Sequence, residues 1–297
     1  LLSQQLQVFL QVAECGSFNK AAEKLYISPP AVIKQINLLE SDLSLRLFIR
    51  THRGLQLTEA GKSLVQDAKY MIQYCKDSVT RAKNAMQKGE EILRIGTSPM
   101  TPAQVLVDLW PQLQEGCPGI KFQLVPFDNT PENAREILAN LGQNIDVVAG
   151  IFDETMLNLR QCAGAEISRE PICCAVSVHH NLAKKDRLTV QDLYGEKLML
   201  MKRGWSHYVD LLRDELWKNH PQIQIIDFDF YSTEVFNQCE NNNCVLMAVP
   251  KWQYVHPLLK ILPVNWGYAI PYGLLHAPEP SPAVRKFLQA VDKMTKK

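Results

Sequence analysis

The stretch GSFNKAAEKLYISPPAVIKQINLLESDLSLRLFIRTHRGLQLTEAG, residues 16–61, decides how the front of the chain folds. Its segment FNKAAEKL follows Ser17, a favourable helix N-cap, and predicts a short helix whose small apolar residues face inward. Ser28 caps the next helix, and Pro29 occupies its first position, where a missing N–H costs nothing. The stretch therefore predicts two helices in close succession.

The helix that begins at Pro29 is amphipathic. Apolar residues recur along it at helical spacing and predict a face buried in a small core: Val32, Ile36, Leu39 and Leu43. The opposite face carries Pro30, Lys34, Asn37 and Ser41. A capped N-terminus with short side chains, followed by a cation one turn later, suits entry into the major groove of DNA.

Another helix precedes this stretch, and a hairpin closes it. One helical face collects Leu2, Leu6, Phe9, Leu10 and Ala13, and Gly16 ends the helix as a C′ glycine. The segment IRTHRGLQLT, residues 49–58, alternates in polarity and turns at Arg53-Gly54. Three helices and such a wing predict a winged helix-turn-helix, which places one helix in a DNA groove.

The expected partner of this unit is double-stranded DNA. Cations on the hairpin can neutralise phosphates and position the helix without reading base sequence. The predicted DNA contacts are Ser28, Pro30, Ala31, Lys34, Gln35, Arg50, Thr51 and Arg53. For any single one of them, a solvated surface residue is the alternative. Charge agrees with a DNA-binding front: residues 1–90 hold 12 Lys and Arg against 8 Asp and Glu, whereas residues 91–297 hold 20 against 23.

A long helix is predicted from Thr58, its cap, to about Lys88, before Gly89. It carries a single apolar seam: Ala60, Leu64, Ala68, Met71, Cys75, Val79, Ala82 and Met86. One seam on a polar rod cannot bury itself, so we expect coiled-coil-like pairing with a second copy of the chain. The alternative is packing against the chain's own second domain.

From Glu91 onward the pattern changes to alternating strands and helices. ILRIGTS, KFQLVPF and IDVVAGIF predict buried strands, separated by helices near residues 102–115 and 130–141. A second set follows, with strands at PICCAVSV, KLMLMK, IQIIDFDF and CVLMAVP, and helices after Thr189, from Ser206 to His220 and near Thr233. A final helix begins at Ser281-Pro282. This alternation predicts α/β architecture with parallel strands.

Composition excludes several classes of protein. With 46% hydrophobic and 21% charged residues the chain is globular, and no apolar run approaches the ~18 residues of a membrane span. The start lacks the pattern of a signal peptide, so we expect a cytoplasmic protein. Eight cysteines without C-x-x-C spacing favour reduced, buried thiols, with a Cys239–Cys244 redox pair as the alternative. His179-His180 does not predict a metal site, because adjacent residues on an extended chain point apart.

Over its whole length the chain resembles the LysR-type transcriptional regulators. The match is close from FLQVAECG to LTEAG, residues 9–61, and looser behind it, where it rests on strand order and phrases such as HHNLA and TVQDL. The resemblance implies a winged helix-turn-helix domain at 1–58, a linker and dimerisation helix at 59–89, and a periplasmic-binding-protein-like effector domain at 90–297. It also implies two effector subdomains, about 90–163 with 268–297 and about 164–267, crossing near Cys162–Ser168 and returning near Asn265–Ile270. A homodimer or homotetramer is expected.

Two residues of the reading helix depart from the family's pattern. The family commonly has Gln where this chain has Pro29, and Ser where it has Ile33. Ile33 either contacts a thymine methyl group or packs locally, and the sequence leaves both readings open.

The resemblance implies a small-molecule effector, anionic or aromatic, between the two subdomains. Carboxyl ends of parallel strands and helix N-termini predict its walls. The candidate effector-binding residues are Thr97, Ser98, Met100, Thr101, Phe127, Gly150, Lys202, Arg203, Trp205 and Ser206. The alternative is that Ser98 and Thr101 are helix caps and Arg203 is a surface charge.

No enzyme is expected, because the chain has no G-x-S-x-G, Walker loop, dinucleotide fingerprint or metal-ligand spacing. No cofactor or metal is expected either. The sequence therefore predicts a DNA-binding regulator controlled by an effector. The alternatives are a regulator set by redox state or assembly, and a small-molecule binding protein whose N-terminal module binds protein.

Overall fold

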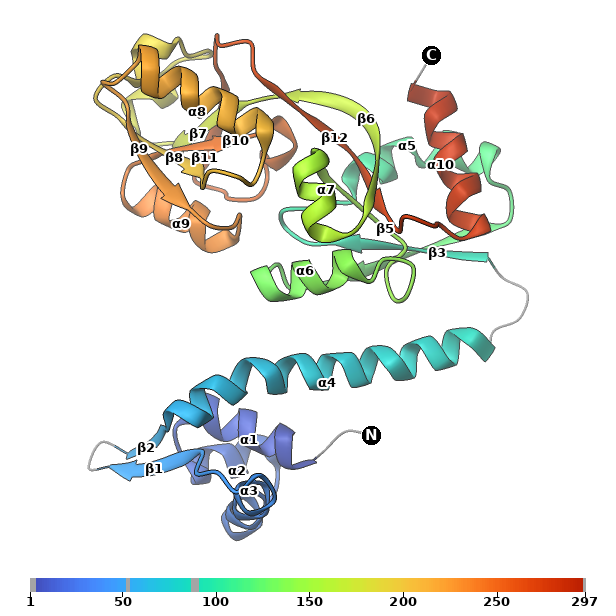
Figure 1. The fold of residues 1–297 in the computed structure, drawn as a ribbon, viewed down its shortest axis with the longest axis vertical. Helices are drawn as coiled ribbons and strands as arrows, with labels where there is room; N and C mark the ends of the chain where they lie inside the picture. Colours follow the sequence, from blue (N-terminus) through green and yellow to red (C-terminus); the bar gives the residue numbers. More distant parts are fainter. Residues whose placement is uncertain (1–3, 52–53, 87–90, 296–297) are drawn as a thin grey trace. The chain divides into compact units, whose positions relative to one another are not determined.

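The computed structural model describes residues 4–51, 54–86 and 91–295 (Figure 1). The chain divides into two compact units, Leu1–Lys88 and Gly89–Lys297.

The first unit is the predicted winged helix-turn-helix with its long following helix. Its elements are α1 (Gln4–Cys15), α2 (Phe18–Leu25), α3 (Pro29–Leu43), β1 (Phe48–Thr51), β2 (Gly54–Leu57) and α4 (Glu59–Met86). Gly16 ends α1 with a φ of 59°, and the Ser17 hydroxyl accepts a hydrogen bond from the backbone N–H of Lys20. The predicted end of the first helix at Gly16 and the predicted N-cap at Ser17 are both confirmed.

The core-facing side of α3 differs from the prediction at one end. Val32, Ile36 and Leu39 are buried as expected, but Leu43 is 41% exposed. Glu40 takes the inward position instead, because its buried carboxylate accepts hydrogen bonds from the backbone N–H groups of Leu47 (2.7 Å) and Phe48 (3.1 Å). The chain turns back immediately after α3, so helical periodicity alone could not identify this polar anchor.

The wing is a two-stranded antiparallel hairpin in which Phe48 pairs with Leu57 and Thr51 with Gly54. The turn predicted at Arg53-Gly54 falls partly outside the described residues. Thr58 caps α4 as predicted: its hydroxyl accepts from the Gly61 N–H at 2.9 Å and donates to the Arg46 carbonyl at 2.6 Å.

The two parts of the predicted apolar seam of α4 lie in different environments. Its first part packs inside the unit, where Ala68 is fully buried and Leu64 contacts the core formed by α1–α3. Farther along, Met71 is 40% exposed and Val79 is 37% exposed. The first part of the seam therefore packs within its own unit, whereas Met71 and Val79 expose part of its remainder. Pairing with a second copy stays a prediction.

The second unit contains two five-stranded sheets. The first has the order β4-β3-β5-β12-β6 and the second the order β11-β7-β10-β8-β9. The elements are β3 (Glu91–Thr97), α5 (Gln104–Gly116), β4 (Ile120–Pro126), α6 (Pro131–Ala139), β5 (Val147–Ile151), α7 (Glu154–Arg160), β6 (Ala163–Pro171), β7 (Cys173–Ser177), β8 (Lys197–Met201), α8 (His207–Asn219), β9 (Gln224–Phe228), α9 (Thr233–Asn241), β10 (Val245–Ala248), β11 (Leu259–Pro263), β12 (Ala269–His276) and α10 (Pro282–Thr295).

Each sheet and its helices form one subdomain with its own core. The first subdomain contains the first sheet with α5, α6, α7 and α10, and the second contains the second sheet with α8 and α9. β3, β4 and β5 are parallel as predicted, and so are β8, β9 and β10. The strand PICCAVSV (β7) is instead antiparallel to β10 and β11.

Two long antiparallel strands, β6 and β12, connect the subdomains (Figure 1). β6 pairs with β12 along its whole length, and Ala165 and Ile167 pack in the first core. The crossover expected at Cys162–Ser168 is therefore too early, because the chain enters the second core only at Ile172. Sequence analysis also missed α7, and the helix expected after Thr189 is a short 3-10 turn, Val190–Leu193.

Candidate functional sites

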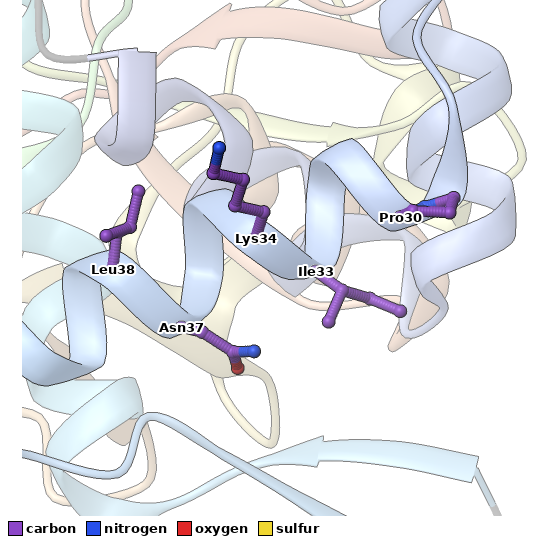
Figure 2. A pocket seen from close by; sticks show the side chains of 5 residues that line it. All are labelled: Pro30, Ile33, Lys34, Asn37 and Leu38. Atoms are coloured by element: carbon purple, nitrogen blue, oxygen red, sulfur yellow. The ribbon is translucent and has the colours of Figure 1, made fainter.

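The outward face of α3 is an open hollow lined by Pro30, Ile33, Lys34, Asn37 and Leu38. Their spacing follows successive helical turns, so the five side chains share one side of the helix. In Figure 2, Ile33 and Asn37 project to one edge of this face and Lys34 and Leu38 to the other. We call this surface the α3 face.

The other predicted DNA contacts surround this face. Ser28 precedes α3 at the N-cap position and is exposed, although its hydroxyl makes no capping hydrogen bond. Ala31 and Gln35 are half-buried on the flank of the helix. Arg50 and Thr51 belong to β1, but their side chains lie outside the described part of the chain, as does Arg53 altogether.

The second unit contains a cavity of about 70 Å³ between its two subdomains. From the first subdomain it is lined by Met100, Thr101, Phe127, Asn129, Ala134, Leu138, Val148, Gly150, Ile151, Met156, Arg160 and Leu275. From the second it is lined by Met201, Phe230, Tyr231 and Trp252. The wall is mostly apolar, which is typical of a small-molecule site.

Four predicted effector residues line this cavity: Met100, Thr101, Phe127 and Gly150. Thr97 ends β3 and Ser98 follows it, and neither is in the lining of the cavity. The hydroxyls of Ser98 and Thr101 lie 2.7 Å apart and hydrogen-bond to each other. The N-cap of α5 is Ala103, so neither residue caps that helix.

The predicted cations of the second subdomain do not line the cavity. Lys202 pairs with Asp229 at 3.3 Å, and Arg203 pairs with Asp214 on the exposed surface. Trp205 is half-buried and Ser206 is 98% buried, but neither belongs to the cavity wall. Lys202, Arg203, Trp205 and Ser206 therefore lie outside the wall of this cavity, and their predicted contact with an effector stays a prediction.

The cation that does line the cavity is Arg160, at the last residue of α7. Its guanidinium lies 5.9 Å from the centre of the Trp205 ring, and no carboxylate among the described residues is within ion-pair distance. Burial lowers the pKa of Arg160, and the charge of Asp153 partly offsets this effect. Arg160 was not among the predicted site residues because α7 was not predicted, although its N-cap residue Asp153 signals the start of a helix.

Hydrogen bonds join the two walls of the cavity. The indole N–H of Trp252 donates to the Met100 carbonyl at 3.0 Å. The Asn129 amide donates to the Tyr231 carbonyl at 2.7 Å. Both bonds link a loop of the first subdomain to a residue of the second core, so the two subdomains are in contact beside the cavity.

The cysteines of the described chain are all free. Cys239 donates to the Cys244 carbonyl at 3.2 Å and is fully buried. Burial, followed by the charges of Cys244 and Glu240, raises the pKa of Cys239 to about 12. In residues 4–51, 54–86 and 91–295 no three His, Cys, Asp or Glu side chains form a group that could hold a metal ion.

Two family models match this chain. The bacterial regulatory helix-turn-helix protein, lysR family, matches residues 3–62, and the LysR substrate binding domain matches residues 87–295. The chain belongs to the LysR family.

Similar proteins agree with this assignment. The HTH-type transcriptional regulator YvbU of Bacillus subtilis is 27% identical over 229 residues, which are 76% of this chain and 75% of YvbU. ClcR of Pseudomonas putida is 31% identical over 169 residues, 56% of this chain and 58% of ClcR. The crystal structure of CbnR, a LysR family transcriptional regulator, is 19% identical, covers 100% of both chains and superimposes with a TM-score of 0.63, which shows a shared fold.

As a LysR-type regulator, the chain is a DNA-binding transcriptional regulator with a C-terminal effector-binding domain. Its partners are DNA and a small-molecule effector. Among the described helices none is both long enough and apolar enough to cross a bilayer.

Proposed function

We propose that a small molecule bound in the cavity between the two subdomains controls how this regulator engages DNA. The observation that carries the proposal is that both subdomains contribute walls to one cavity. A ligand that touches both walls binds one arrangement of the subdomains more tightly than another, and this difference in affinity is what shifts a conformational equilibrium.

The chemistry of the cavity wall suits a small apolar or aromatic carboxylate. Met, Phe, Tyr and Trp side chains supply an apolar wall, and Arg160 supplies a cation without a carboxylate partner. A guanidinium holds a carboxylate through two parallel hydrogen bonds, which are stronger in a site removed from water. Ser98 and Thr101, whose hydroxyls are beside the cavity, are proposed to contact the same ligand.

The test is a thermal-shift screen followed by calorimetry, comparing aromatic carboxylates with matched amides such as benzoate and benzamide. The carboxylates are expected to stabilise the protein and the amides not. Arg160→Met should remove this preference, whereas Lys202→Met, an exposed cation outside the cavity, should keep it. Stabilisation by carboxylates that survives Arg160→Met contradicts the ligand assignment.

The α3 face and the wing are proposed as the DNA-binding surface, with Ser28, Pro30, Ala31, Lys34, Gln35, Arg50, Thr51 and Arg53 as contacts. Support comes from the exposed Lys34 on α3 and from the helix-turn-helix family match. The protein's affinity for DNA from around its own gene should fall steeply as the salt concentration rises, because phosphate contacts release counterions. If Lys34→Ala and Arg53→Ala both bind as wild type does, this surface is wrongly assigned. A purely protein-binding module would lack the salt dependence.

The winged helix-turn-helix is proposed to act in pairs, through residues 59–89. The part of α4 beyond Ala68 exposes Tyr70, Met71, Tyr74 and Val79, which is an apolar surface suited to a second copy. A homodimer, or a homotetramer built from two dimers, would present two reading helices to two half-sites. The protein is proposed to work in the cytoplasm, where its DNA lies, and to catalyse no reaction.

The pKa values of Cys173 and Cys239 do not support control of the protein by oxidation of these thiols. Burial raises the pKa of Cys173 to about 11 and that of Cys239 to about 12, so neither is a thiolate at neutral pH. Because the thiolate is the reactive form, these residues are poor redox sensors.

A further inference from the structure

We infer that Ile33 is a specificity-determining residue that reads the C5-methyl group of a thymine in each half-site. The inference rests on the proposed role of the α3 face as the DNA-reading surface, and it adds the base that this surface recognises.

Ile33 does not belong to the core of its unit. Val32 and Ile36, its neighbours on α3, are at most 2% exposed, and they pack with residues of α1 and α2. The apolar residues that pack around this core come from every neighbouring element, but Ile33 is not among them. Ile33 is half-buried, so local packing covers part of its side chain, but this packing is not part of the core cluster of the unit.

Ile33 instead belongs to an outward apolar surface. It lines the α3 face with Pro30 and Leu38, and Leu38 is 41% exposed. Ile33 is half-buried, so part of its apolar area stays in water after folding. A partner that covers the α3 face would remove this area from water and gain hydrophobic free energy.

The partner of this face is the major groove of DNA, and thymine supplies its apolar group. Of the four bases only thymine presents a methyl there, and apolar side chains read it by contact. Lys34, next in sequence, provides the positive charge that a groove flanked by phosphates requires.

The neighbour of Ile33 on this face strengthens the assignment. Asn37 lies one turn further along α3, and Figure 2 shows both side chains projecting to the same edge of the helix. An asparagine amide can pair with the N6 and N7 edge of adenine. The two side chains together suit adjacent A·T and T·A pairs, with Ile33 on the thymine methyl.

The position of Ile33 along the helix also fits base reading. α3 begins at Pro29, so Ile33 is in its second turn. Reading helices contact base edges mainly through their N-terminal residues. Leu43 is an exposed apolar residue at the end of α3, and helical spacing places it on the side opposite the α3 face, so it offers a control.

The experiment removes single methyl groups from the DNA. The full-length protein first selects a duplex from a random library. Each thymine of that duplex is then replaced, one at a time, by deoxyuridine, which keeps the base pairing and lacks only the C5-methyl. Binding is measured by fluorescence anisotropy at one fixed salt concentration, for wild type, Ile33→Ala and Leu43→Ala. Thermal unfolding of each variant checks that the fold is intact.

Wild type and Leu43→Ala are expected to lose about fourfold in affinity at one thymine of each half-site, the effect of one buried methyl group. Ile33→Ala should bind the thymine and deoxyuridine duplexes equally. The inference is overturned if no deoxyuridine substitution weakens wild type, or if Ile33→Ala keeps the full methyl effect. If the protein selects no duplex at all, the proposed DNA-reading surface fails, and the inference fails with it.

Discussion

The carboxylate of Asp153 accepts a hydrogen bond of 2.7 Å from the backbone N–H of His207. Asp153 precedes α7 in the first subdomain, whereas His207 begins α8 in the second. The other carboxylate oxygen accepts from the Met156 N–H at 2.9 Å. One buried carboxylate thus satisfies N–H groups at the starts of two helices in different subdomains, where a negative charge is also favoured by both helix dipoles.

Replacing Asp153 by Ala should destabilise the second unit by about 2 kcal/mol, since each lost cap costs about 1 kcal/mol. The change should be measured by urea unfolding followed by tryptophan fluorescence. Affinity for a carboxylate that binds the cavity should fall as well, because the Asp153–His207 bond favours the arrangement in which both walls meet the ligand.

Two variants sharpen this test. Glu154→Ala changes an exposed acid in the first turn of the same helix and should cost much less. Asp153→Asn keeps one acceptor oxygen and should fall between wild type and Asp153→Ala. Equal unfolding curves for Asp153→Ala and Glu154→Ala would show that the bridge between the two helices contributes nothing.

Local signals explain why much of the first unit could be predicted from sequence. Ser17, Pro29 and Thr58 mark helix starts through hydrogen bonds or ring geometry that involve only the next few residues. Leu43 was misplaced because burial at that end of α3 depends on the chain returning to Glu40. The prediction is therefore wrong at the point where a tertiary contact decides which side chain is buried.

The cavity could be predicted only in part, for the same reason. Met100, Phe127 and Gly150 follow or end parallel strands, and strand order alone brings such residues together. Whether Lys202 faces the cavity depends on how its loop folds, and the sequence does not encode that locally. β6 was missed because its partner, β12, is about a hundred residues away along the chain.

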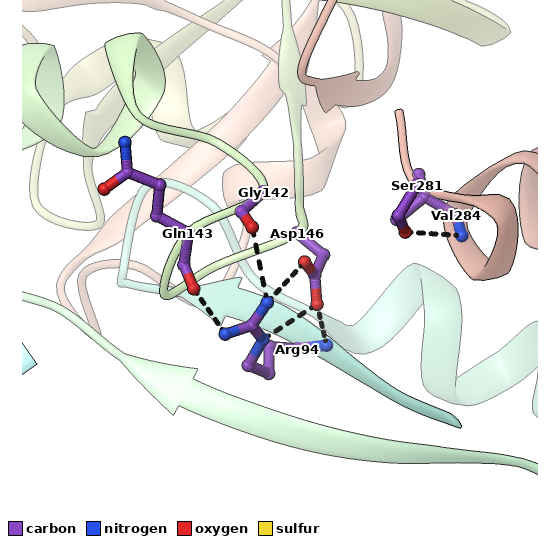
Figure 3. A network of polar contacts seen from close by, with 6 residues as sticks. All are labelled: Arg94, Gly142, Gln143, Asp146, Ser281 and Val284. Carbon is purple, nitrogen blue, oxygen red and sulfur yellow. Dashed lines mark hydrogen bonds and ion pairs between the residues drawn. The ribbon is translucent and has the colours of Figure 1, made fainter. Parts of the chain in front are cut away.

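The first subdomain contains a buried ion pair between Arg94 and Asp146 (Figure 3). The Arg94 guanidinium donates to both carboxylate oxygens of Asp146 at 2.8–2.9 Å, and it also donates to the carbonyls of Gln143 and Gly142. The Arg94 backbone N–H donates to the same carboxylate at 2.8 Å. The pair therefore joins β3 to the loop before β5.

Arg94→Ala should lower the free energy of unfolding of the second unit by about 3–5 kcal/mol, because it leaves the buried Asp146 charge without its partner. Lys202→Ala removes an exposed ion pair of the same unit and should cost at most about 1 kcal/mol. The double variant Arg94→Ala/Asp146→Ala should lose less than the two single losses combined. Strict additivity in urea unfolding would show that the two groups are not coupled.

Cys239 should stay unalkylated in the folded protein. Burial raises its pKa to about 12 and covers its Sγ, so the thiol stays mostly protonated between pH 7 and 9.5 and should react with iodoacetamide much more slowly than an accessible thiol at each pH. Urea should expose it and allow labelling, whereas Cys15, half-buried on α1, should label without urea. Mass spectrometry identifies the labelled residues. Rapid formation of a Cys239–Cys244 disulfide in the folded protein would support the redox alternative.

Gly150 and Gly273 are direct partners across β5 and β12. Replacing each of them by alanine should nevertheless have different effects on stability. A Cβ on Gly150 would meet only the side chains of Thr101 and Leu275, at 3.7 and 3.8 Å, which are ordinary contacts. A Cβ on Gly273 would lie 1.9 Å from the Ala165 carbonyl oxygen of β6, so the backbone would have to move.

Gly150→Ala should therefore fold with unchanged or slightly higher stability, while its new methyl group fills part of the cavity that Gly150 lines. Affinity for a carboxylate ligand should fall about tenfold, as expected for overpacking by one methyl group. Gly273→Ala should instead lose stability, because β6 and β12 can no longer approach each other closely. Calorimetry with the carboxylate and urea unfolding separate the two effects. Full ligand affinity in Gly150→Ala would place the effector elsewhere than in this cavity.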